Sequence, residues 1–338
     1  MKKPVLILLL IFQAGLLCAQ LDASHSYDFL NLPVGARVAG LGGVVISSTD
    51  QDVNLFLSNP ALLDSVNHNH ISWSHLSYYA DVQYNSFAYA WNLKRLGPIG
   101  IGVQHMGYGE FDSYDLAGNA LGKTSANETA VVLSHSHTLG LFTMGANLRF
   151  ISSNIDSYGS SALTMDLGGT FTHPTHELQV ALLFKNMGVV FSDYTGSSES
   201  TLPFDVQMGV TFKPEHMPFR FSVTAYNLGK SGSVYYDADF SEDDEPGKVD
   251  EIFRHINLGT EVVISQNFQL RVGYNHLIRK ELKMEEKQGL AGISLGAMVR
   301  IKMFELSYTF TTYHIDSGRS YFTITSNLNK VFKKKSII

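Results

Sequence analysis

Long stretches of this chain alternate apolar and polar residues with a period of two, and this pattern restricts the possible folds most strongly. In residues 142–150 every even-numbered side chain is apolar, whereas Asn147 and Arg149 lie at odd positions. Successive side chains of a β-strand point to opposite faces, so the stretch predicts a strand with one apolar and one polar face. We predict fourteen strands, near residues 70–79, 82–93, 98–107, 128–138, 142–150, 163–167, 180–184, 204–212, 219–225, 256–264, 268–274, 293–301, 304–310 and 322–328.

In the regularly alternating strands, charged residues occupy the polar face and are missing from the apolar face. The charged residues are Arg149, Asp166, Lys185, Asp205, Arg220, Glu261, Arg271, Arg300 and Glu305. A lipid-facing Arg or Lys at the bilayer midplane costs about 2–4 kcal/mol, which explains a charge-free face. A soluble barrel would expose this apolar face to water. The pattern therefore predicts an all-β fold, a 14-stranded transmembrane antiparallel β-barrel whose charges face the interior.

The predicted connections alternate in length from the second strand onward. Short ones lie near residues 94–97, 138–140, 173–177, 213–218, 265–267 and 302, and long ones near 108–127, 153–161, 188–201, 228–255, 276–289 and 313–320. Outer-membrane barrels have short periplasmic turns and longer external loops. We therefore expect the long connections to face outward. The first hairpin, around residues 79–81, is short where a long loop is due.

The first twenty residues have the features of a secretory signal peptide. Lys2 and Lys3 precede an apolar run of residues 5–17, and Ala19 offers a cleavage site. Cleavage there removes the only cysteine, Cys18, and changes the formal charge from −6 to −8 as two lysines are lost. That charge argues against nucleic acid as a partner. We expect a signal peptide at 1–19, export to the bacterial outer membrane, and a basic C-terminal tail at 333–338.

Residues 20–66 are too many for a simple tether before the first strand, and they are rich in apolar side chains and turn formers. A segment this apolar is not expected to stay solvated in the periplasm. The interior of the barrel, which we place at residues 67–332, is the economical location for it. We therefore predict that residues 20–66 plug the barrel. The lumen is closed if Arg149, Arg220 and Arg271 pair with interior acids or with Asp50 and Asp52 of the plug, whereas an aqueous pore would leave these charges solvated.

Several segments resemble the PorQ family, outer-membrane barrels of the type IX secretion system of Bacteroidota. The matching residues are 27–34, 36–39, 41–43, 50, 52–55, 59–63, 225–228, 273–275, 279–282 and 323–328. The family is related to the PorV and long-chain fatty-acid transporter barrels, whose plugs also carry an Asn-Pro-Ala element. The resemblance implies fourteen strands and a plug motif of Asn31, Pro33, Arg37, Gly42, Gly43, Asp50, Asp52, Asn54, Asn59 and Pro60.

The resemblance also implies a function. The chain would be a non-enzymatic subunit of the type IX secretion and surface-attachment machinery, anchoring other subunits of that machinery beside outer-membrane lipid and lipopolysaccharide. The alternative is a transporter that passes a hydrophobic small molecule through the plug and a lateral gap. Five glycines, from Gly97 to Gly109, crowd the third strand. They bend the wall under the transporter hypothesis, or they fit a narrow interior that needs small residues.

Motifs for catalysis or cofactor binding are missing from the sequence. It contains no zinc-protease helix or phosphate-binding loop, and its one Gly-x-Ser-x-Gly run, residues 292–296, opens a predicted strand instead of forming a strand-to-helix turn. Two His-x-His pairs, His68 with His70 and His135 with His137, place imidazoles on one strand face without a third ligand nearby. The acidic residues between Asp237 and Glu251 favour a solvated external loop over a calcium site. We therefore expect no enzyme activity, no cofactor and no metal.

Overall fold

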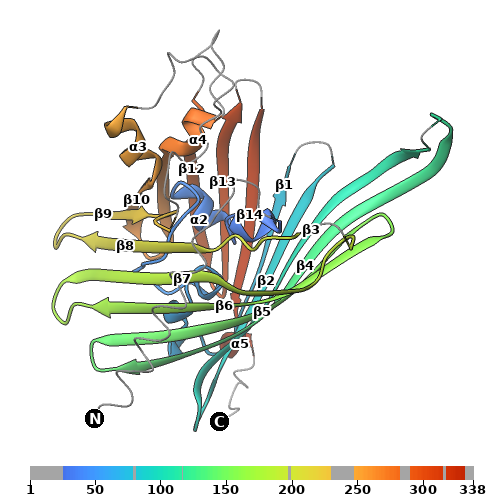
Figure 1. Ribbon diagram of the computed structural model, residues 1–338. Helices are drawn as coiled ribbons and strands as arrows, with labels where there is room; N and C mark the ends of the chain where they lie inside the picture. The colour runs from blue at the N-terminus through green and yellow to red at the C-terminus, as the bar shows by residue number, and fades with distance from the viewer. Residues whose placement is uncertain are drawn as a thin grey trace.

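The computed structural model describes residues 26–78, 81–115, 117–196, 199–229, 247–281, 290–314 and 317–331. In these residues fourteen antiparallel strands form a closed barrel in which each strand pairs with its neighbours in sequence and β1 pairs with β14 (Figure 1). The predicted barrel and its strand number are confirmed. The strands are β1 (His70–Ser77), β2 (Gln83–Leu93), β3 (Gly97–Tyr114), β4 (Ala120–Leu139), β5 (Phe142–Ile155), β6 (Tyr158–Thr172), β7 (Glu177–Ser192), β8 (Asp205–Lys213), β9 (Phe219–Ala225), β10 (Ile256–Ser265), β11 (Phe268–Asn275), β12 (Ile293–Ile301), β13 (Phe304–His314) and β14 (Ser317–Asn327).

The two faces of the wall differ as the period-two pattern requires. On β5, Leu148 and Phe150 are about half exposed on the outside, whereas Asn147 and Arg149 are buried on the inside. The seam between the first and last strands is continuous from His70 opposite Asn327 to Ser77 opposite Ser320. This closed ring leaves no sheet edge along the seam, so the strand backbones satisfy one another within the hydrocarbon layer.

The connections correct part of the sequence prediction. The predicted long connection at 153–161 is a turn of residues 156–157, because β5 continues to Ile155 and β6 begins at Tyr158. The predicted loops at 108–127 and 313–320 are likewise largely strand, since β3 reaches Tyr114, β4 starts at Ala120, and β13 and β14 end and begin at His314 and Ser317. Above the apolar belt both faces of a hairpin meet water, so the alternation that marks a strand disappears. The connections at 193–204, 226–255 and 276–292 remain long.

A non-strand segment, residues 26–69, lies inside the barrel (the blue chain in Figure 1). It contains the short helices η1 (Asp28–Asn31), α2 (Ala36–Gly40), η2 (Val53–Leu57), η3 (Pro60–Leu62) and η4 (Ser65–Asn67). Its side chains form most of the core together with inward-facing residues of the wall. Phe56 and Leu57 pack with Ala88 and Val132, for example.

Three further helices lie at the ends of the barrel. α3 (Lys248–Arg254) precedes β10, α4 (His276–Glu281) follows β11, and α5 (Leu328–Val331) follows β14. α3 and α4 therefore belong to the end with the long connections, hereafter the long-connection end, and α5 to the short-turn end (Figure 1). Among the helices of the described ranges, none has the length and hydropathy of a membrane-spanning helix.

Some sequence predictions concern residues that the structure does not describe. The expected signal peptide at 1–19, the basic tail at 333–338, most of the acidic loop and residues 79–80 of the first hairpin lie outside the described residues. The boundaries proposed for these segments stay predictions.

Candidate functional site

Side chains of the wall bind the backbone of the interior segment on many sides of the barrel. Ser86 of β2 and Ser136 of β4 donate to the carbonyl oxygens of Val34 and Leu63, both at 2.6 Å. Further donors to the segment's carbonyls are Asn147, Lys185, Thr211, Asn257, Asn275 and Thr309, at 2.6–3.2 Å. A segment without sheet pairing must find partners for its buried polar backbone, and the wall supplies them.

Glycines let the segment approach the wall closely. A Cβ atom on Gly168 of β6 would lie 1.9 Å from Oδ1 of Asn59, and one on Gly273 of β11 would lie 2.0 Å from the amide nitrogen of Gly42. In β3, Cβ atoms on Gly100 and Gly102 would crowd Phe56 and Leu57. These two β3 glycines therefore make room for side chains of the interior segment, as the narrow-interior interpretation expects.

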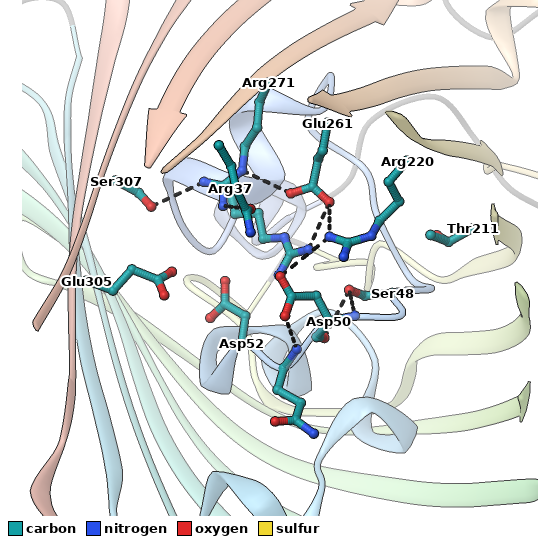
Figure 2. Close-up of polar contacts among 12 residues, drawn as sticks. Arg37, Ser48, Asp50, Asp52, Thr211, Arg220, Glu261, Arg271, Glu305 and Ser307 are labelled. Carbon is teal, nitrogen blue, oxygen red and sulfur yellow. Dashed lines mark hydrogen bonds and ion pairs between the residues drawn. The ribbon is translucent and has the colours of Figure 1, made fainter. Parts of the chain in front are cut away.

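A buried network of charges joins the segment to β9, β10 and β11 (Figure 2). Glu261 of β10 accepts hydrogen bonds from Arg37 of α2 at 2.9 Å and from Arg220 of β9 at 2.8 Å, both on Oε2. Its Oε1 accepts from Nε of Arg271 at 3.0 Å. Asp50 of the segment lies 3.5 Å from Arg37 and 3.4 Å from Arg220. We call these five residues the segment network.

The network has three guanidinium groups and two carboxylates, and both carboxylates contact more than one arginine. Asp52 and Glu305 lie beside it (Figure 2). Glu305 accepts from Arg300 at 2.7 Å near the short-turn end, and Asp52 accepts from the backbone of Asn54 at 2.9 Å. Arg37, Glu261 and Arg271 are at most 5% exposed. A buried charge of this kind is tolerated when it is paired and hydrogen-bonded, so the arrangement fixes the segment against the wall.

A second buried cluster lies entirely within the wall, on β5, β6 and β7, and we call it the wall cluster. Asp166 accepts from NH2 of Arg149 at 2.9 Å and from Nδ2 of Asn147 at 3.1 Å. It also accepts from the backbone N–H of Asn186 at 2.8 Å, and Arg149 donates to the Asn186 side chain at 2.7 Å. Asn186 sits in a β-bulge opposite Asp166 with a φ of 57°. The cluster therefore holds an irregular point of the sheet.

The structure distributes the predicted interior charges among these groups. Lys185 donates to the carbonyl oxygen of Leu30 at 2.9 Å, and Asp205 lies opposite it in the β7–β8 register. All nine side chains are on the inner face, but Arg149 pairs with Asp166 of the wall rather than with the plug acids. The sequence pattern did not single out Asn186 or Asn257, and Asn275 entered only through the family resemblance. An Asn at the end of an alternating stretch is a weak signal, because such residues are also common in turns.

The residues of the predicted plug motif divide into structural and cavity-lining groups. Asp52 and Asn59 cap the short helices η2 and η3 by accepting from the backbone amides of Asn54 and Ala61, and Asn59 beside Pro60 also donates to the carbonyl of Ile46. The side chain of Asn54 donates to Asp52 and to Ser72 of β1. Arg37 and Asp50 belong to the segment network, next to Asp52. The residues that line a cavity are Asn31, Pro33, Gly42 and Gly43.

This cavity has a volume of about 200 Å³ and lies between the interior segment and the wall, at the long-connection end. Val34, Val45 and Ile46 line it from the segment, and Leu277 and Ile278 line it from α4. Its polar lining includes Lys185, Asp205, Gln207, Tyr226, Asn227, Asn275 and Glu281. The cavity therefore has an apolar side and a polar side of similar extent, and small-molecule sites likewise combine apolar surface with polar groups that orient the ligand.

The histidine pairs do not form a metal site in the part of the chain that the structure describes. Nδ1 of His68 accepts from the backbone amide of Asn92 at 3.0 Å, and Nδ1 of His135 lies 3.0 Å from the carbonyl oxygen of Pro98. Within the described ranges, no group of three or more His, Cys, Asp or Glu side chains is arranged to hold a metal ion.

Comparison with solved structures supports the fold. No sequence-family description and no curated protein sequence matches the chain. The toluene transporter TbuX of Ralstonia pickettii is similar in structure, with a TM-score of 0.52 and 10% identity over 88% of this chain and 98% of TbuX. The TodX monoaromatic hydrocarbon channel has a TM-score of 0.49 and 11% identity over 86% and 96% of the two chains. A FadL homologue of Pseudomonas aeruginosa has a TM-score of 0.45 and 7% identity over 87% and 98%.

The likeness to TbuX shows a shared fold. Together with the apolar exterior of the closed barrel, it indicates a bacterial outer-membrane protein. These comparisons give no specific support for the PorQ family or for type IX secretion.

Proposed function

We propose that the protein transports a small, mostly apolar molecule, about the size of one aromatic ring, across the outer membrane. The cavity carries this proposal. Its volume of about 200 Å³ exceeds that of an apolar protein cavity of about 150 Å³ that binds benzene. It lies against the interior segment, so a bound molecule would contact the part of the chain that must move for passage. TbuX, which shares the fold, is a toluene transporter.

Binding is the first test. Purified protein in detergent is titrated with toluene and, separately, with oleate, whose chain is far larger than the cavity. Toluene should bind and oleate should not. Substitution of Val45 by Trp fills the cavity and should abolish toluene binding, whereas Val131→Trp, on the lipid-facing side of β4, should leave it unchanged. Equal binding of toluene to both variants would contradict the assignment of the cavity.

Movement of the interior segment is the second test. A Cβ atom on Gly259 of β10 would lie 2.9 Å from Cβ of Leu41 and 2.5 Å from Oγ of Ser222. In a Ser222→Ala background, cysteines at positions 41 and 259 therefore lie close to the Cβ separation of a disulfide, about 3.5–4.5 Å. With Cys18 replaced by Ala, this pair locks the segment to the wall. Uptake of radiolabelled toluene by cells with the locked protein should fall to background and recover on reduction. The single-cysteine variants are the matched controls.

We propose as a second candidate that the barrel is an anchoring subunit of a type IX secretion machinery. The segment network and the hydrogen bonds around the wall favour it, because they hold the segment as a fixed filler. The resemblance of the N-terminal residues to the PorQ family adds to this support. The same disulfide separates the two candidates. An anchor with a locked segment should still support cargo secretion, whereas a transporter with a locked segment should not transport.

A further inference from the structure

The helix α3 is amphipathic in the reverse sense of an ordinary surface helix. Val249, Ile252 and Phe253 follow the i, i+3, i+4 spacing of one helix face and are 68%, 60% and 43% exposed. Phe253 keeps one edge contact, with the ring of His276. A helix on a water-soluble surface turns such an apolar stripe toward the protein.

Asp250 and Arg254 of α3 instead face the protein. Asp250 accepts from Nε of Arg254 at 2.9 Å and from Nε2 of His276 at 2.8 Å. The ammonium group of Lys280 lies 2.9 Å from the same carboxylate. His276 and Lys280 belong to α4, so ionic contacts attach α3 to the barrel and leave its apolar stripe outside. A contiguous exposed apolar surface of this kind marks a contact with an apolar partner.

β9, the strand before the connection that contains α3, is too short to span the apolar layer. β9 has seven residues, whereas β4 has twenty. Seven residues at 3.3 Å each, tilted by 35–45°, rise about 16–19 Å, which is less than the ~25 Å of the apolar band of outer-membrane barrels. The apolar surface of the wall would therefore end several ångströms below the membrane boundary at β9.

Exposed apolar residues continue upward from this wall into α3. Val223 of β9 and Leu258 of β10 lie opposite each other in the register, and both are exposed to the lipid side. Above them, Leu228 follows β9 and is 43% exposed. β10 begins at Ile256, two residues after the end of α3. The stripe of α3 is therefore continuous in sequence with the lipid-facing surface.

We propose that α3 is an interfacial helix whose Val249, Ile252 and Phe253 insert among the lipid acyl chains of the outer leaflet and complete the apolar belt above β9. The partner is the lipid surface, because the stripe extends a surface that already faces lipid. Asp250 links this helix to α4, whose Leu277 and Ile278 line the cavity. The helix α3 is therefore linked through its ion pair with α4 to one wall of the cavity. This inference does not depend on the proposed transport function.

Spin labels in proteoliposomes test the proposal, in full-length protein with Cys18 replaced by Ala. A nitroxide is attached to Ile252→Cys, and its relaxation is measured with oxygen, which partitions into the membrane, and with a water-soluble nickel chelate. Leu258→Cys is the lipid-facing reference, and Tyr114→Cys, 59% exposed at the end of β3, is the water-exposed reference. We expect the label at Ile252 to respond to oxygen as Leu258 does and to nickel at least fivefold less than Tyr114 does.

Two results would overturn the proposal. A response to nickel like that of Tyr114 would place α3 in water. Protection from both reagents would show that protein, either this chain or a second copy, covers the stripe. The same measurement at Val249→Cys, one turn earlier on the same face, guards against a local distortion caused by the label at Ile252.

Discussion

The wall cluster and the segment network are both built around buried arginines, but they join different parts of the chain. In the wall cluster, Arg149 and Asp166 pair diagonally across adjacent strands and are 17 residues apart in sequence. In the segment network, Arg37 reaches Glu261, which is 224 residues away. The first stabilises strand pairing at a bulge, whereas the second holds a segment that has no sheet pairing with the wall.

Because of this difference, the two clusters stabilise different parts of the molecule. A cluster within the sheet is lost only when neighbouring strands separate, so its stability belongs to the whole barrel. In the segment network, the contacts of Arg37 and Asp50 break when the segment moves, whereas Glu261 keeps Arg220 and Arg271 within the barrel wall, which can stay closed. A protein that must open its interior needs the second arrangement, because the first offers no movable part.

The largest effect is expected for the wall cluster. Asp166→Ala leaves Arg149 buried without its carboxylate and removes an acceptor from Asn147 and from the Asn186 backbone. Loss of one partner of a buried ion pair costs about 3–5 kcal/mol. The free energy of unfolding, measured by urea titration in lipid vesicles with the fluorescence of the two tryptophans, should fall by this amount. A loss below about 1 kcal/mol, the range of exposed ion pairs, would show that the wall cluster does not stabilise the barrel as a buried ion pair should.

A smaller global effect is expected for the segment network. Glu261→Gln removes the negative charge on which Arg37, Arg220 and Arg271 converge. The glutamine keeps an oxygen that can accept from Arg220 or Arg271, so the global loss should stay below that of Asp166→Ala, while the segment loses the charge that holds Arg37. The reactivity of a cysteine at Val45, which is 3% exposed in the native chain, should rise at least tenfold in maleimide labelling, or about 1.4 kcal/mol.

Glu305→Gln is the matched control for Glu261→Gln. Glu305 is also a glutamate on the inner face, but its arginine partner Arg300 is 34% exposed at the side chain. Labelling at Val45 should stay near the native rate. If Glu305→Gln or Asp166→Ala raised labelling at Val45 as much as Glu261→Gln does, the segment network would not be energetically separate from the rest of the barrel.

A third effect is expected where α3 contacts α4. Loss of the ion pairs of Asp250 should lower the free energy of local opening by about 1 kcal/mol, because these pairs are partly exposed. Although burial opposes it, hydrogen bonds from His276, Lys280 and Arg254 hold the pKa of Asp250 well below its usual range. A carboxylate with a lowered pKa stabilises the fold above its unfolded pKa of about 3.9, and this contribution is lost as the pH falls through the lower folded value. Hydrogen exchange of the α4 amides, corrected for intrinsic rates, should therefore show the Asp250 contribution intact between pH 7 and 5. Asp250→Asn should speed exchange several-fold at pH 7, and no change would contradict the ionic attachment of α3.

Sequence periodicity predicted the barrel, its fourteen strands and the inward direction of the charges, because lipid on one side forces a strict alternation. It could not predict the extension of β3 and β4 to Tyr114 and Ala120, where both faces meet water. The sequence also did not determine which acid pairs with Arg149, because strand register decides whether Asp166 or a plug acid lies within reach. The apolar content of residues 20–66 pointed to the interior, but the cavity beside Val34 and Val45 depends on packing between distant segments.

The smallest effect is expected for an ion pair that shares the chemistry of both clusters but lacks burial. Lys123 of β4 lies 3.2 Å from Glu110 of β3, and both side chains are about two-thirds exposed. They lie beyond the last pairs with β2 and β5, Gly107 with Gln83 and Ala126 with Ile155, so they stabilise only the projecting hairpin. An exposed pair contributes about 0.2–1 kcal/mol, and salt screens it.

A double-mutant cycle of Lys123→Ala and Glu110→Ala measures this pair directly. The coupling energy in the urea titration should be below about 0.5 kcal/mol at 0.15 M salt and should shrink further at 1 M. The segment, monitored by a cysteine at Val45, should not respond, because the hairpin has no contact with the segment network. A coupling energy comparable to the loss in Asp166→Ala would mean that burial does not set the scale of these ion pairs. The pair of Lys123 and Glu110 could then not serve as the exposed reference for the two buried clusters.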